Sequence, residues 1–307
     1  MKEGSIRSAN QFVGNFKNGI SLYVKREDLL HPVISGNKFR KLKYNLLEAK
    51  KQEKTGLLTF GGAYSNHIPA VATAGKETGL TTIGFIRGEE LGAKVENTLK
   101  QNPTLNFSAK KGMDLKFISR EEYREKNTGA YLQELQQKFP DYYILPEGGT
   151  NSLAIKGCEE ILSEDDKDFD FICCAVGTGG TIAGLANSAN EAQKIYGFPA
   201  LKGAFLKKEI SVLISAKNWE LFEEYHFGGY AKMTSELINF INEFKARYKI
   251  ALDPVYTGKM FFGIFDLVEK GNFPQNSRIL AIHTGGLQGI SGMNSALTKR
   301  NLPKIDV

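Results

Sequence analysis

The sequence predicts an α/β fold with mostly parallel sheet. Five short apolar runs, rich in β-branched and aromatic residues, are each followed at once by glycine and small polar residues, as expected of strands buried on both faces. Segments with helical periodicity separate these runs. With 307 residues, 41% hydrophobic and 24% charged, the chain has the composition of a globular protein and room for two domains.

The elements are predicted in alternating order along the chain. The strands cover residues 57–60, 82–86, 142–145, 171–176 and 279–283. The helices cover residues 39–54, 69–78, 130–139, 181–196 and 236–248. In an open parallel sheet, ligands bind beyond the carboxyl ends of the strands, so the five glycine-rich junctions are expected to form one rim around a ligand.

Glycine is over-represented, with 32 of the 307 residues against a typical frequency of ~7%. The glycines show no collagen-like period and proline is scarce, so low-complexity disorder does not explain them. Many follow the predicted strands, where a backbone without side chains can approach a ligand closely. They therefore point to a backbone-lined anion or cofactor site.

Several other classes of protein are disfavoured. Two stretches without charged residues, 56–75 and 171–190, hold too many glycines and polar residues for membrane helices, and the first residues lack the apolar core of a signal peptide. The net charge of +6 is mild and no nucleic-acid-reading motif accompanies it. We therefore expect neither a membrane nor a nucleic-acid partner.

The cysteines and histidines do not suggest a metal. Cys158, Cys173 and Cys174 lack CxxC spacing and are expected to be structural thiols, and their low, odd number is typical of a reducing cytoplasm. The four histidines show no HExxH or paired spacing. We therefore expect a cytoplasmic protein without a metal site.

A phosphate site is predicted in the sequence GTGGT at residues 177–181, directly after a strand. Glycines let successive backbone N–H groups converge, and the following helix adds positive potential at its N-terminus. The segment lacks the lysine of a P-loop and the third glycine of GxGxxG. A phosphate bound outside both nucleotide motifs is therefore implied.

A nucleophilic amine is predicted at Lys38, in the sequence SGNKFRK at residues 35–41. Asn37 can cap the helix that follows, which places Lys38 in the first turn, where the helix dipole disfavours a positive charge. That environment favours the neutral amine that a Schiff-base lysine requires.

A third polar group lies in the sequence GGAYSNH at residues 61–67, where Ser65 and Asn66 offer a hydroxyl and an amide on one turn. The GxSxG elbow of a serine hydrolase is absent, because Gly62 lies three residues before Ser65 where the motif needs a glycine two residues before it. A serine hydrolase is therefore not predicted.

Six ordered motifs together resemble one known family. They are KREDLLHPVISGNKFRKLKYNL, TFGGAYSNH, PEGGTN, AVGTGGT, DPVYTGK and HTGG, and they span roughly residues 25–289. In this order they resemble the pyridoxal 5'-phosphate (PLP) enzymes of the 1-aminocyclopropane-1-carboxylate (ACC) deaminase / D-cysteine desulfhydrase family. The resemblance implies fold type II, the tryptophan synthase β-like fold, with two open, twisted, mostly parallel sheets. It also implies a large PLP-binding domain at 1–41 and 152–307 and a small inserted α/β domain at 42–151.

The resemblance implies a role for each matched residue. Lys38 matches the lysine that binds the cofactor covalently, and Asn66 matches the asparagine that hydrogen-bonds its phenolic oxygen. Ser65 and Tyr256 match residues that face the substrate, and Thr284 is placed to meet the pyridine nitrogen. The phosphate loop is matched by Gly177, Thr178, Gly179, Gly180 and Thr181.

Two positions help to choose an activity within the family. ACC deaminases typically carry glutamate after the tyrosine and leucine in the last motif, whereas this chain has Thr257 and Thr284, as desulfhydrase-type members do. The resemblance therefore favours β-elimination from a small amino acid such as D-cysteine, giving pyruvate, ammonia and sulfide. We also expect a homodimer.

Other functions stay open at this point. Within the enzymes, the alternatives are ACC deaminase itself or a threonine/serine dehydratase-like lyase. A PLP-binding protein without turnover is an alternative of another class. A nucleotide-dependent oxidoreductase is the weakest, because GxGxxG is missing.

Overall fold

The protein is represented by a computed structural model that describes residues 7–203, 205–214 and 216–306. Its described residues divide into two compact units. One comprises Lys41–Ala154, and the other comprises residues 7–40 and 155–306. The sequence-based domain limits of 41/42 and 151/152 stay a prediction.

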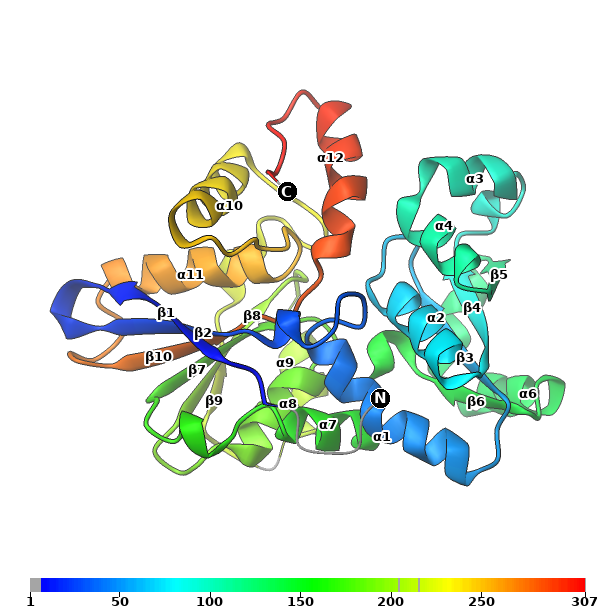
Figure 1. The fold of residues 1–307 in the computed structure, drawn as a ribbon, viewed down its shortest axis with the longest axis horizontal. Helices are drawn as coiled ribbons and strands as arrows, with labels where there is room; N and C mark the ends of the chain where they lie inside the picture. Colours follow the sequence, from blue (N-terminus) through cyan, green and yellow to red (C-terminus); the bar gives the residue numbers. More distant parts are fainter. Residues whose placement is uncertain (1–6, 204, 215, 307) are drawn as a thin grey trace. The chain divides into compact units, whose positions relative to one another are not determined.

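The unit of residues 7–40 and 155–306 contains a six-stranded sheet (Figure 1), with the strand order β1-β2-β10-β7-β8-β9. Only the β1–β2 pair is antiparallel among its described strands. The strands are β1 Asn10–Asn15, β2 Ser21–Lys25, β7 Phe171–Val176, β8 Lys194–Pro199, β9 Trp219–Leu221 and β10 Arg278–Ile282.

Helices cover both faces of this sheet (Figure 1). They are α8 Gly180–Ser188 and α9 Phe205–Ser211 on one face, and α10 Ser235–Tyr248 and α11 Thr257–Glu269 on the other. Successive side chains of β7 point to opposite faces of the sheet. Cys173 packs toward α10 and α11, whereas Cys174 packs toward α8 and α9. Both thiols and Cys158 are fully buried, which confirms the prediction of structural thiols.

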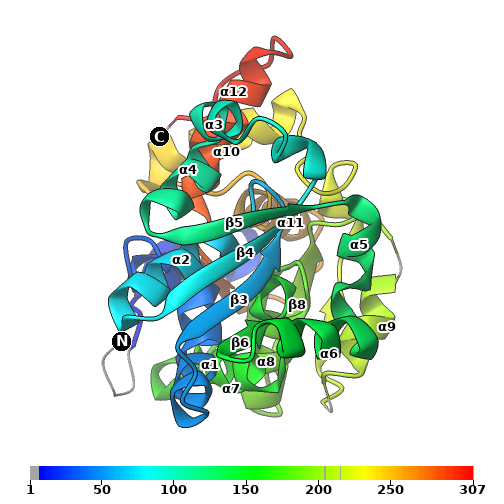
Figure 2. The ribbon, with the colours of Figure 1, turned by 90° about the vertical axis from the view of Figure 1, so that its right-hand side faces the viewer.

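Lys41–Ala154 contains a second, four-stranded sheet in which all pairs are parallel, with the order β5-β4-β3-β6 (Figure 2). Its strands are β3 Gly56–Gly61, β4 Thr81–Arg87, β5 Met113–Ile118 and β6 Tyr142–Leu145. Its helices are α2 His67–Thr78, α3 Val95–Gln101, α4 Pro103–Lys110, α5 Arg120–Arg124 and α6 Gly129–Lys138. Helices α1 Asn37–Lys51 and α7 Ser152–Glu159 contain the two points where the chain passes from one unit to the other. The last helix, α12 Ile290–Thr298, follows β10.

The predicted fold class, with two mostly parallel sheets, is confirmed, and so are all five predicted strands. The predicted helix at 181–196 was too long, because α8 ends at Ser188 and β8 begins at Lys194. Asn190 makes the turn between them, since its side-chain oxygen accepts the backbone N–H groups of Ala192 and Gln193. The segment after Ser188 is rich in small residues that a helix tolerates, and for this reason the predicted helix was extended too far. The hydrogen bonds of the Asn190 side chain instead form a turn there.

The five glycine-rich junctions do not lie along one sheet. Three follow β3, β4 and β6 of the four-stranded sheet, and two follow β7 and β10 of the six-stranded sheet. The five junctions therefore do not form a rim along the edge of one sheet, and a shared ligand site stays a prediction. The motif order along the chain does not show which strands pair.

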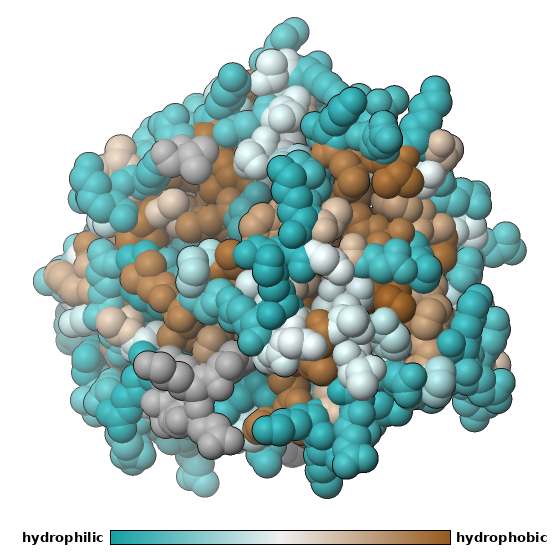
Figure 3. Space-filling view, turned by 45° about the vertical axis from the view of Figure 1, so that its right-hand side comes forward, coloured by the Kyte–Doolittle hydropathy of each residue, from teal (hydrophilic) through white to brown (hydrophobic). Residues whose placement is uncertain are grey.

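No helix among the described residues is long and apolar enough to cross a membrane. The two uncharged stretches are instead a strand, a glycine turn and a helix in succession. Figure 3 shows hydrophilic side chains, in teal, interspersed with apolar ones over the face in view.

Candidate active site

The predicted phosphate loop joins β7 to α8 in the six-stranded unit. Gly179 precedes α8 in the left-handed conformation, with φ +81°, and a Cβ there would lie 2.6 Å from Ile210. No side chain caps α8, and its first turn holds no acidic residue. The loop therefore needs glycine at this position, and the dipole of α8 is available to an anion.

The structure places Lys38 in the first turn of α1, as predicted, but the role expected for Asn37 was wrong. The helix begins at Asn37 itself, after Gly36. The Asn37 side-chain amide donates to the Thr181 hydroxyl of the phosphate loop at 2.8 Å, and its oxygen accepts from Lys38 Nζ at 3.4 Å. Asn37 thus connects Lys38 to the phosphate loop through two hydrogen bonds.

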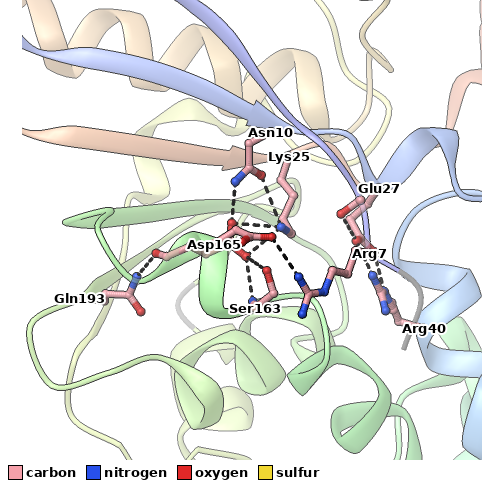
Figure 4. Close-up of polar contacts among 10 residues, drawn as sticks. Arg7, Asn10, Lys25, Glu27, Arg40, Ser163, Asp165 and Gln193 are labelled. Carbon is pink, nitrogen blue, oxygen red and sulfur yellow. Dashed lines mark hydrogen bonds and ion pairs between the residues drawn. The ribbon is translucent and has the colours of Figure 1, made fainter. Parts of the chain in front are cut away.

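A buried ion pair fixes the start of α1. Arg40 donates two hydrogen bonds to the Glu27 carboxylate, from Nε at 2.8 Å and from Nη2 at 2.7 Å (Figure 4). Both side chains are almost completely buried, and Ser8 adds a third hydrogen bond to the same carboxylate. A bidentate pair allows little rotation, so it holds the helix turn that carries Lys38.

Thr284 follows β10 and lies against the residue before α1. The backbone at Gly36, with φ +61°, approaches Thr284 so closely that a Cβ would lie 1.9 Å from the Thr284 carbonyl oxygen. The next residue fits the same way, because a Cβ at Gly285 would lie 2.3 Å from the Ser35 hydroxyl. Backbone packing therefore holds Thr284 against Gly36, which precedes Lys38 by two residues in the sequence.

His283, the residue before Thr284, stabilises the same turn through hydrogen bonds of both its ring nitrogens. Its Nε2 donates to the Ala251 carbonyl at 2.7 Å, and its Nδ1 accepts the Gly285 backbone N–H at 3.2 Å. Complete burial lowers the pKa of His283, although Asp28 nearby raises it. A neutral imidazole with its proton on Nε2 satisfies both contacts, which makes His283 a structural residue of this turn.

Tyr256 lies at the start of α11, beside the phosphate loop. A Cβ at Gly177 would lie 3.2 Å from the Tyr256 ring, so glycine gives the ring its place. The Asp253 carboxylate accepts the backbone N–H groups of Tyr256 and Thr257 at 2.6 and 3.1 Å, which fixes the turn. Burial raises the pKa of Asp253 to about 6, and these backbone donors and Lys259 oppose the rise.

Ser65 and Asn66 lie in the other unit, on the turn between β3 and α2. The Ser65 hydroxyl accepts the His67 backbone N–H at 3.3 Å. Asn66 precedes α2, yet its side chain does not cap the helix. Both residues thus stand at the carboxyl end of a buried parallel strand, the usual location for ligand-binding groups.

The residues of the six-stranded unit fit a phosphate ester with an aldehyde-bearing ring. The loop offers a glycine turn and an uncapped helix N-terminus for the phosphate, and the lysine tied to that loop offers an amine. Lys38, Thr181, Tyr256 and Thr284 are brought together around Gly36, Asn37 and Gly177. Their assignment to cofactor and substrate stays a prediction.

The sequence interpretation missed the supporting roles of Arg40 and Asp253. Arg40 pairs with Glu27, 13 residues earlier, and Asp253 accepts backbone N–H groups of the turn that leads into α11. Only Asp253 carried a local signal, because an aspartate whose carboxylate accepts backbone N–H groups two to four residues later is typical of a turn.

The chain is similar to known proteins over most of its length. The family "pyridoxal-phosphate dependent enzyme" matches residues 8–285. A putative 1-aminocyclopropane-1-carboxylate deaminase of Thermotoga maritima is 34% identical over 305 residues, covering 92% of this chain and 93% of the relative. A bifunctional D-cysteine desulfhydrase/1-aminocyclopropane-1-carboxylate deaminase of Arabidopsis thaliana is 33% identical, covering 89% of this chain and 74% of the relative.

The fold has a similar counterpart among solved structures. The crystal structure of an ACC deaminase homologue superposes with a TM-score of 0.79 at 32% identity, covering 96% of this chain and 94% of that one. The family match over most of the chain, the relatives above 30% identity and this superposition agree. The chain belongs to the family of pyridoxal-phosphate dependent enzymes.

Proposed function

We propose that the enzyme cleaves a small amino acid by β-elimination, with D-cysteine as substrate, and releases pyruvate, ammonia and sulfide. The observation that carries this proposal is Thr284, a neutral hydroxyl residue packed against the turn that leads to Lys38. A hydroxyl near the cofactor's ring nitrogen favours a neutral ring. A neutral ring withdraws electrons only moderately, which suits loss of a good leaving group such as a thiolate.

Each proposed site residue has a task that its position supports. When bound, PLP supplies an electron sink for the pair left when a bond at the substrate's α-carbon breaks. Lys38 holds the cofactor and takes up the α-proton through its amine, which Asn37 orients. Tyr256, which the Asp253 turn holds beside Gly177 of the phosphate loop, assists that proton transfer through its phenol.

The remaining proposed contacts bind and orient. The backbone N–H groups of residues 177–181 and the N-terminus of α8 hold the phosphate. Asn66 donates to the ring's phenolic oxygen, and Ser65 binds the substrate carboxylate or moves a proton. In the balanced reaction, cysteine and water give pyruvate, ammonia and hydrogen sulfide.

ACC deamination is the second candidate, because relatives at 33–34% identity bear that name alone or together with D-cysteine desulfhydrase. One observation stands against it. Thr257, at the position where ACC deaminases carry glutamate, is fully buried, and its hydroxyl accepts the Asp253 backbone N–H at 2.8 Å. Thr257 therefore brings no carboxylate to the site.

A substrate panel tests the proposal. The purified, PLP-loaded enzyme is incubated separately with D-cysteine, L-cysteine, β-chloro-alanine, D-serine and ACC, and pyruvate, sulfide and 2-oxobutyrate are measured. We expect D-cysteine to give pyruvate and sulfide in equal amounts, at the highest kcat/KM of the panel. Preferential formation of 2-oxobutyrate from ACC would establish the second candidate, and no product from any compound would leave a PLP-binding protein without turnover.

A further inference from the structure

Lys259 is a buried ammonium to which the proposed mechanism gives no task. It lies in the first turn of α11 with 1% of its surface exposed. Its Nζ donates to the backbone carbonyls of His226 and Gly229, at 2.8 Å each. Burial lowers the pKa of Lys259 to about 8 and Asp253 raises it, so the amine is mostly protonated at neutral pH. A buried charge is costly unless it is hydrogen-bonded, and here the two carbonyls accept its hydrogen bonds while Asp253 adds a favourable electrostatic contribution.

The segment that Lys259 holds has an unfavourable backbone. Phe227 and Ala231 have φ values of +52° and +55°, and the glycines between them have φ values of +90° and +115°. Left-handed conformations at non-glycine residues cost free energy and persist only where the surroundings impose them. Two contacts with α11 impose them here, namely the Lys259 hydrogen bonds and the packing of Phe227 on Phe262 at 4.9 Å between ring centroids.

The same segment carries Tyr230, which packs on Tyr256. The two ring centroids are 6.1 Å apart and the ring planes are inclined at 69°, an edge-to-face contact. Tyr256 in turn lies against Gly177 of the phosphate loop. A continuous path of contacts therefore leads from Lys259 through residues 226–230 to the Tyr256 ring.

We propose that Lys259 is a positioning residue for the reaction, whose two hydrogen bonds hold residues 226–231 so that Tyr230 keeps the Tyr256 ring in place. The proposal rests on the proposed function, in which Tyr256 assists proton transfer. Lys259 acts through the backbone of another segment and touches neither substrate nor cofactor.

The test compares Lys259→Met with a matched control, Lys270→Met. Lys259 lies in the first turn of α11, and Lys270 directly follows the last residue of that helix. Lys270 is exposed and pairs with Asp266. For Lys259→Met we expect faster hydrogen exchange in residues 226–232 and a fall in kcat of roughly 10- to 100-fold, the size expected from a misplaced group. The borohydride-reducible link of PLP to Lys38 should persist, and KM should change by less than about threefold because substrate binding is untouched. Lys270→Met should leave exchange in this segment and kcat unchanged.

Other results would overturn the proposal. Unchanged exchange and kcat in Lys259→Met would show that the lysine does not position the segment. If that variant fails to fold, the wild-type protein decides, because the Gly229 and Lys232 amides donate to the carbonyls of His226 and Gly229 at 3.0 and 3.1 Å. Slow exchange of both amides supports a held segment, and exchange as fast as in an unstructured peptide contradicts it.

The two proposals fail separately. If the wild-type enzyme turns over no compound of the panel, the proposed function is wrong, while the exchange comparison, which needs no substrate, still decides whether Lys259 holds the segment. If D-cysteine is turned over and the exchange comparison shows no difference, only the role of Lys259 is wrong.

Discussion

Arg40, two residues beyond Lys38 on α1, forms a bidentate ion pair with the buried Glu27. Their exposed fractions are 2% and 0%, so neither charge can be solvated by water if the other is removed. The pair therefore links the stability of the fold to the position of the lysine that is proposed to bind the cofactor.

Removing one member of this pair should be strongly destabilising. We expect Glu27→Ala to lower the apparent free energy of unfolding by about 3–5 kcal/mol, because Glu160, at 3.9 Å, is then the one carboxylate left near the buried Arg40 charge among the described residues. The exposed pair of Lys17 and Glu269 supplies the control, and Glu269→Ala should cost less than about 1 kcal/mol. Urea unfolding measures both, and equal shifts would contradict the assignment.

Replacement of Lys38 should abolish the covalent link. Lys38→Ala should lose the borohydride-reducible bond to PLP and fall below detectable turnover, because no other amine in the first turn of α1 replaces it. Lys50→Ala, an exposed position on the same helix, should keep both. Peptide mapping after borohydride reduction gives the answer, and a label on a lysine other than Lys38 in the wild-type enzyme would refute the role.

The close approach at Gly36 should not tolerate a methyl group. Gly36→Ala would place a Cβ 1.9 Å from the Thr284 carbonyl oxygen, so the Thr284 turn must move and PLP should be retained less tightly. Gly271 has a similar φ of +72° with no atom within 4 Å of a Cβ, so Gly271→Ala carries only the backbone strain. PLP dissociation constants of the two variants separate the clash from the strain, and equal values would argue against the packing.

Asp253 should make stability depend on pH between about 4 and 6. Its folded pKa is raised to about 6 from an ordinary value of 3.8, so the folded protein keeps a proton that the unfolded chain loses in this window. The stability that this group contributes is thus fully present below pH 4 and is lost as pH rises toward 6. The stability of the wild type relative to Asp253→Asn should fall over that window, and urea unfolding at several pH values checks it. A constant difference would contradict the raised pKa.

Five strands were predictable because each is an apolar run ended by a glycine turn, a signal that lies within a few residues. Other described strands, such as β5 and β8, lack that turn and were not predicted. The pairing of the five strands was not predictable, because it depends on contacts between distant segments, and the five junctions divide between two sheets. The same distinction applies to the site. Lys38 and the 177–181 loop carry local signals, whereas Arg40 and Lys259 show their roles only through Glu27 and the carbonyls of residues 226 and 229.

The three cysteines have a practical consequence for following the unfolding of this protein. All are fully buried, so an alkylating reagent meets no exposed thiol in the native state. Burial also raises the pKa of Cys173 and Cys174, which keeps these two thiols protonated. All three also belong to the unit of residues 7–40 and 155–306. In a timed alkylation experiment, the gain in mass would therefore report how often that unit opens. It would not report the opening of Lys41–Ala154, which contains no cysteine. The three native cysteines thus serve as built-in probes for the unfolding of the unit that holds Lys38.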